Sequence, residues 1–93
     1  MLHIENVEWV GGYLLSLKFD DGMSKVVDVL PLLRGTMFEP LREISMFSAV
    51  SIDPVSRTVV WPNGADLAPE ALYTLSAVLN NGGPNNVVNG SRR

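Results

Sequence analysis

The chain has 93 residues, 46% of them hydrophobic, and this length and composition predict one small globular domain. It contains no cysteine, which excludes disulfides, thiolate zinc sites and cysteine catalysis. Residues 1–79 contain all ten acidic residues and five of the seven basic ones, which gives this region a net charge of −5. The other two basic residues, Arg92 and Arg93, end the chain. Because no Lys/Arg cluster occurs in this region, we expect no direct nucleic-acid binding by the domain.

No apolar run approaches the roughly 18 residues that would cross a bilayer, and the first five residues lack the basic start of a secretory signal. We therefore expect a cytoplasmic protein without a membrane partner. A domain this small leaves apolar surface that a second subunit could cover, so a homodimer remains open.

The first third of the chain is typical of strands joined by tight turns. Residues 4–10 and 13–19 are rich in apolar side chains and flank Gly11-Gly12, which predicts a hairpin. Asp20-Asp21-Gly22 is the strongest turn signal, because Asp-Gly accepts left-handed backbone angles. Residues 24–28 then return as a third strand.

The length of this second turn sets the register of the hairpin that it closes. A two-residue loop at Asp21-Gly22 would place Leu17 opposite Val26. It would also place Lys18 opposite Lys25, a like-charge pair that is unfavourable. A three-residue loop therefore stays open as the alternative.

The middle of the chain predicts short helical turns and then a second hairpin. Residues 29–35 form an apolar stretch that ends in glycine, and residues 40–47 carry apolar side chains at a spacing near three. Residues 49–53 alternate, residues 54–56 interrupt the pattern, and residues 58–61 are β-branched and aromatic, which predicts two further strands.

One amphipathic helix is expected after this hairpin. Within residues 69–79, Leu72, Leu75 and Leu79 recur at intervals of three and four, which directs one helix face onto the sheet. Asp66 precedes the helix, where its carboxylate could accept a hydrogen bond from a backbone N–H of the first turn.

Together these elements predict an α+β fold. It consists of an antiparallel sheet of about five strands built from hairpins, short helical turns, and one C-terminal amphipathic helix packed on the sheet. Residues 1–79 are expected to form a single domain. Residues 80–93 open with Asn80-Asn81-Gly82-Gly83-Pro84, are poor in apolar side chains and predict a flexible polar tail.

Residues able to carry catalysis are few. His3 is the only histidine in the sequence, and a triad or a metal site would need acidic partners that folding must bring to it. Asp20 and Asp21 could act as an acid/base pair, but turn geometry already explains them, and the ligand spacing of a calcium loop is absent. Gly11-Gly12 and Gly82-Gly83 lie outside any phosphate-binding pattern. We predict no catalytic residue, metal ligand or cofactor.

The best candidate for a binding site is the corner that follows the second hairpin. Trp61, Asn63 and Asp66 lie at this strand-to-helix corner, and with Arg42 they are the residues we expect to contact a partner or a small ligand. The simpler interpretation is favoured for each: Trp61 packs in the core, Asn63 forms a turn, Asp66 caps the helix and Arg42 is solvated.

Three motifs occur in order along the chain. They are Phe19-Asp20-Asp21-Gly22, then Gly35-Thr36-Met37-Phe38-Glu39-Pro40-Leu41-Arg42, then Trp61-Pro62-Asn63-Gly64-Ala65-Asp66 with Pro69-Glu70-Ala71-Leu72-Tyr73. With these motifs the chain resembles, from about residue 7 to residue 73, a small bacterial family, domain of unknown function 2442. The resemblance implies an α+β domain with an antiparallel sheet, and it brings no established catalytic residues.

Members of that family look like stand-alone small proteins, proteins with an added helix-turn-helix domain, or products of genes beside a second small partner in a toxin–antitoxin-like arrangement. This chain stops soon after the predicted helix, so we expect no DNA-reading domain in it.

We therefore expect a non-catalytic protein-binding or regulatory module, in its most specific form the antitoxin-like half of a two-protein system whose partner is encoded by a neighbouring gene. An acidic surface suits a basic partner and salt-dependent association. The alternative is a small-ligand-binding or weakly enzymatic protein with its site at the Trp61–Asp66 corner. A third hypothesis is a structural role through homodimerisation by an exposed strand edge.

Overall fold

The computed structural model describes residues 1–78 of the chain. Three consecutive strands, β1 (Ile4–Trp9), β2 (Leu14–Phe19) and β3 (Ser24–Asp28), form an antiparallel sheet in the order β1-β2-β3. Two short strands, β4 (Ser51–Ile52) and β5 (Val59–Val60), form a second antiparallel sheet. Along the chain, the 3-10 helices η1 (Leu30–Leu32) and η2 (Glu39–Arg42) and helix α1 (Ile44–Phe47) come between β3 and β4, and α2 (Pro69–Tyr73) follows β5.

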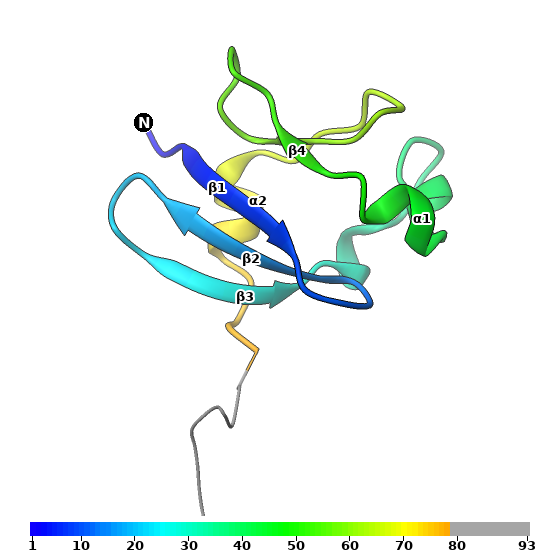
Figure 1. Ribbon diagram of the computed structural model, residues 1–93, viewed down its shortest axis with the longest axis horizontal. Helices are drawn as coiled ribbons and strands as arrows, with labels where there is room; N and C mark the ends of the chain where they lie inside the picture. The colour runs from blue at the N-terminus through cyan, green and yellow to red at the C-terminus, as the bar shows by residue number, and fades with distance from the viewer. Residues whose placement is uncertain (79–93) are drawn as a thin grey trace, which may run out of the picture.

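The predicted α+β class with antiparallel strands is confirmed, but the single sheet of about five strands is wrong. The five strands of the described residues belong to two sheets. Figure 1 shows β4 beside β1 and α2 behind the three-stranded sheet. A backbone hydrogen bond links β1 to the loop between β4 and β5, from the Ile4 amide to the carbonyl of Arg57 at 2.9 Å. Strands β4 and β5 contribute only two residues each, too short a ladder to extend the larger sheet.

The β2–β3 hairpin closes through the three-residue loop that the sequence left open. Leu17 lies opposite Lys25, which removes the unfavourable lysine pair of the two-residue alternative. The Phe19 amide donates to the carbonyl of Met23 at 2.8 Å, and Gly22 has a φ of 94°. Glycine supplies this left-handed angle without steric cost. The register also places Lys25 on the face of the sheet that carries the buried Leu17.

The core fills the space between the two sheets and the helical turns. Alternate residues of β2 are fully buried, as the period of a half-buried strand requires. The buried hydrophobic set is Ile4, Leu15, Leu17, Phe19, Val27, Val29, Leu33, Leu41, Phe47, Val59, Trp61, Ala65 and Leu72. Of the predicted inner face of the C-terminal helix, Leu72 lies in α2 and is buried, whereas Leu75 lies beyond the end of the helix.

Helix α2 is shorter than the apolar spacing predicts. It ends at Tyr73, so the predicted continuation through residues 74–78 is wrong. The Nζ of Lys25 donates hydrogen bonds to the backbone carbonyls of Tyr73 and Leu75, and a lysine at this position satisfies carbonyls that have lost their helical partners. Leu79 and the predicted tail, residues 80–93, lie outside the described residues.

After α2 the chain reaches the outer edge of the three-stranded sheet. The Val78 amide donates to the carbonyl of Val26 at 2.8 Å, at the edge of β3 that does not pair with β2. Among residues 1–78 no helix is long and apolar enough to cross a membrane.

Candidate functional site

Trp61, the first of the four predicted contact residues, lies inside the protein. Its side chain is 2% exposed, and its indole Nε1 donates to the backbone carbonyl of Phe47 at 2.8 Å. The rings of Phe47 and Trp61 also pack with their centroids 5.7 Å apart. The predicted core position of Trp61 is confirmed, so this ring is not displayed at the surface of the corner.

Asn63 holds two loops together. Its Nδ2 donates to the carbonyl of Met37 at 2.9 Å, and its Oδ1 accepts from the Ala65 amide at 3.0 Å. Gly64 beside it has a φ of 89°, as the predicted Asn-Gly turn requires. Both ends of the Asn63 amide thus bond within the chain.

Asp66 does not cap α2, so that prediction is wrong. The residue preceding the helix is Ala68, and no side-chain hydrogen bond caps it. The physical reason is that the backbone of Asp66 is still extended and pairs with Val60 as an isolated β-bridge. Asp66 therefore lies in an extended segment before Ala68, where its carboxylate does not cap the first helical turn. The residue is exposed.

Arg42 lies at the end of η2 and supports the neighbouring turn. Its Nε donates to the carbonyl of Leu33 at 3.0 Å, while its own carbonyl accepts a hydrogen bond from the Tyr13 hydroxyl. The four predicted residues therefore comprise a buried ring, an amide bonded at both ends, a guanidinium that donates to the backbone, and an exposed carboxylate.

The structure assembles a different polar group around the β2–β3 turn, which we name the acidic turn cluster: His3, Asp20, Asp21, Lys25 and Tyr73. His3 and Asp20 are 17 residues apart in the chain, yet the His3 amide donates to Asp20 Oδ1 at 3.1 Å. His3 Nδ1 lies 3.0 Å from Asp20 Oδ2, and because a carboxylate only accepts, this nitrogen carries the proton.

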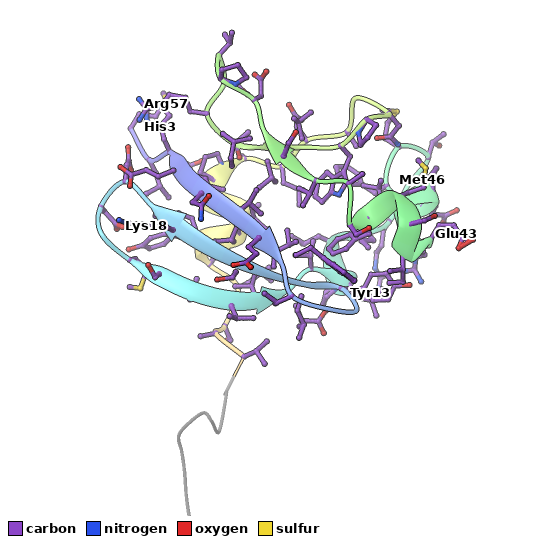
Figure 2. All side chains as sticks on the ribbon, in the orientation of Figure 1. His3, Tyr13, Lys18, Glu43, Met46 and Arg57 are labelled. Carbon is purple, nitrogen blue, oxygen red and sulfur yellow. The ribbon has the colours of Figure 1, made fainter. Side chains whose placement is uncertain are left out.

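The pKa of Asp20 is lowered, first because its carboxylate accepts the hydrogen bond from the His3 amide. The His3 side chain and the positive charge of Arg57 act in the same direction, and partial desolvation opposes them. Figure 2 shows His3 and Arg57 at the same end of the molecule, where the Arg57 carbonyl also binds the Ile4 amide.

Asp21, next to Asp20, binds the end of α2 instead. The Tyr73 hydroxyl donates to Asp21 Oδ2 at 2.6 Å, and the Met23 amide donates to Oδ1 at 2.9 Å. The Tyr73 bond is the main reason that the pKa of Asp21 is lowered and that the pKa of Tyr73 is raised. The Tyr73 ring packs edge-on against the Phe19 ring, with the two ring centroids 4.9 Å apart. Lys25 Nζ lies 5.3 Å from the centroid of the Tyr73 ring.

The acidic turn cluster has part of the chemistry of a general base. A histidine whose Nδ1–H is held by a carboxylate keeps Nε2 available to take a proton. Within residues 1–78, however, no hydroxyl group hydrogen-bonds to His3, and no three His, Asp or Glu side chains gather in a group that could hold a metal. What the cluster does is join the N-terminal segment, the β2–β3 turn and the end of α2.

Trp9 is an exposed aromatic residue that the sequence analysis did not single out as a candidate contact. Trp9 ends β1 and is 40% exposed, and the adjacent Val10 is 45% exposed. The indole Nε1 of Trp9 donates to the carbonyl of Gly12 at 2.9 Å. Its position beside Gly11-Gly12, which carry no side chain to cover a ring, is the signal that could have indicated this exposure.

Comparison with known proteins identifies a family and no individual relative. No curated protein and no solved structure matches the chain. The family described as Protein of unknown function (DUF2442) matches residues 4–77, which include every strand and helix described above and all three sequence motifs. The chain therefore belongs to the DUF2442 family.

Proposed function

We propose that this chain is a non-catalytic protein-binding module of the bacterial cytoplasm, and that in its most specific form it is the antitoxin-like half of a two-protein system. The observation that carries the proposal is Trp9, a large aromatic side chain that stays 40% exposed while its indole N–H is bonded to the loop beside it. Tryptophan is enriched among the residues that dominate protein interfaces.

The engagement of the polar side chains supports a non-catalytic role. His3 bonds to Asp20 and, within residues 1–78, to no hydroxyl group that it could activate; Asp21 bonds to Tyr73, and both ends of the Asn63 amide bond to backbone. A catalytic group has to be free to exchange a proton or an electron pair with substrate. These groups instead make the contacts that hold distant segments together.

The two-protein form is supported by what the family resemblance implies, namely genes that lie beside a second small partner. Small-ligand binding at the Trp61–Asp66 corner has weaker support, because Trp61 is buried and the Asn63 amide is bonded at both ends. Homodimerisation is the other outcome that the experiment below distinguishes.

The test is co-expression of the full chain with the product of the neighbouring gene, followed by affinity purification and light scattering on a sizing column. We expect a complex heavier than the 10.2 kDa chain that contains both proteins. The chain alone, measured at high concentration in the same way, reports a homodimer. A chain that remains a monomer with and without the neighbouring product would contradict the proposal.

A further inference from the structure

The Trp9 ring is held in place before any partner arrives. Trp9 pairs with Leu15 across the β1–β2 hairpin, and its indole Nε1 donates to Gly12 at 2.9 Å. The loop after it is anchored by Tyr13, whose ring packs against Phe47 at 5.5 Å and whose hydroxyl donates to the carbonyl of Arg42. Figure 2 shows Tyr13 at the α1 end of the molecule. A ring fixed in this way loses little conformational entropy on binding.

The surroundings of the ring are open and partly apolar. Val10 is 45% exposed, and a Cβ built on either Gly11 or Gly12 would meet no atom within 4 Å. An approaching chain can therefore reach the ring and the glycine backbone together. We name the segment from Glu8 to Gly12 the Trp9 surface.

The charge around the Trp9 surface is negative. Strand β1 and the loop that follows it carry Glu5 and Glu8 and no lysine or arginine, and Glu8 is exposed. Residues 1–78 as a whole carry ten acidic and five basic residues. Two of the bases, Lys25 and Arg42, donate to backbone carbonyls, and a third, Lys18, lies 3.9 Å from Glu5.

We infer that the Trp9 surface docks a basic segment of a partner protein that wraps the end of β1, with an apolar side chain against Trp9 on one face of the strand and a lysine or arginine against Glu8 on the other. The inference rests on the proposed binding function and adds the place and the chemistry of binding. Complementary charge favours a basic partner. A second copy of this chain would bring the same acidic side chains together, so the charge disfavours the chain itself as the occupant.

The probe is a phage-displayed library of random peptides selected against the full chain. We expect the enriched peptides to combine lysine or arginine with an aromatic or aliphatic residue.

Affinities are measured with labelled synthetic peptides. Trp9→Ala should weaken binding by about thirtyfold or more, as for a central interface tryptophan. Glu8→Lys should weaken binding and flatten its dependence on salt. Val55→Ser is the matched control, because Val55 is 88% exposed on a different loop, and it should bind like the wild type.

A second readout does not depend on a variant. Trp61 is 2% exposed, so acrylamide quenching of the free chain reports mainly on Trp9. A saturating tryptophan-free peptide should reduce this quenching. Both readouts apply equally to a complex with the neighbouring gene product.

Three results would overturn the inference and leave the proposed function standing. They are equal binding by Trp9→Ala and Val55→Ser, unchanged quenching at saturation, and selection of neutral or acidic peptides. If the wild-type chain binds neither a peptide nor the neighbouring gene product, both the inference and the proposed function are overturned.

Discussion

The Tyr73 hydroxyl donates a 2.6 Å hydrogen bond to the carboxylate of Asp21 and so fastens the end of α2 to the β2–β3 turn, 52 residues earlier in the chain. The same turn binds His3 through Asp20. The acidic turn cluster therefore joins three segments that are distant in sequence, and its carboxyl groups accept these hydrogen bonds most strongly when they are ionised.

Acid is expected to destabilise the fold through this cluster. The pKa values of Asp20 and Asp21 are lowered, and so is the pKa of Asp53, which lies outside the cluster and accepts hydrogen bonds from Ser56. A carboxyl group with a lowered pKa in the folded state binds fewer protons there than in the unfolded chain, so its contribution is present above the ordinary value of 3.8 and is lost as pH falls through the lowered pKa. The urea concentration at the unfolding midpoint, measured from pH 7 to pH 2, should decrease as the pH passes through this range. The Asp21→Asn variant should have a lower midpoint at pH 7, and its midpoint should depend less steeply on pH in acid. An acid slope that Asp21→Asn leaves unchanged would contradict this role of Asp21.

Tyr73 should produce the opposite dependence at high pH. Its pKa is raised because its hydroxyl donates to Asp21, so its contribution is present below the ordinary value of 10.0 and is lost as pH rises through the raised pKa. Tyr73→Phe keeps the ring that packs on Phe19 and removes the hydroxyl. We expect a small loss of stability at pH 7 and a smaller further loss above pH 10 than in the wild type, both measured by urea unfolding. Identical alkaline profiles for the two proteins would count against the prediction.

Lys25 is expected to stabilise the end of α2. Its Nζ donates to the carbonyls of Tyr73 and Leu75, and Lys25→Met keeps the aliphatic stem while leaving both carbonyls without this donor. Since hydrogen bonds to a charged donor contribute about 1.5–3 kcal/mol, the free energy of unfolding should fall by about that amount. Exchange of the Val78 amide proton should also accelerate, because the segment after α2 is released from β3.

The control for this substitution is Lys18→Met. Lys18 lies on the neighbouring strand and is largely exposed, and its Nζ lies 3.9 Å from Glu5 Oε1. Removing such a surface ion pair changes the free energy of unfolding by about 0.5 kcal/mol or less. If both lysine variants unfold at the same urea concentration, the helix-ending role of Lys25 is wrong.

The two tryptophans should differ sharply on replacement by phenylalanine. Trp61→Phe removes buried ring volume and leaves the Phe47 carbonyl without its donor, so the free energy of unfolding should fall by about 2–4 kcal/mol. Trp9→Phe removes a partly exposed ring and should cost about 1 kcal/mol or less. Urea unfolding of the two variants measures both values, and equal losses would contradict the assignment of Trp61 to the core and Trp9 to the surface.

Local signals in the sequence were sufficient for the hairpins and the first turn of α2. Asp21-Gly22 carries its own turn geometry, Asn63-Gly64 does the same after β5, and Pro69 fits a first helical turn because it lacks an N–H. Each of these features depends on neighbouring residues, which is why the pattern alone predicts it.

Features that depend on distant residues could not be predicted in this way. Helix α2 ends where Lys25, from another element, binds its carbonyls, although the apolar spacing continues. The pairing of His3 with Asp20 requires the register of β1 on β2, and that register is shifted by an irregularity between Ile4 and Asn6. Asp66 has the composition of a helix cap and fails to cap because its backbone pairs with Val60.

The measurement that tests the central claim most directly is fluorine NMR of the full chain labelled with fluorotryptophan, titrated with the unlabelled product of the neighbouring gene. The chain contains two tryptophans, so two resonances are expected, and Trp9→Phe assigns them. Binding through the Trp9 surface predicts that the Trp9 resonance shifts or broadens with added partner while that of Trp61 stays in place. Two unchanged resonances at saturating partner, or a change at Trp61 alone, would contradict the claim that Trp9 is the contact through which this protein binds its partner.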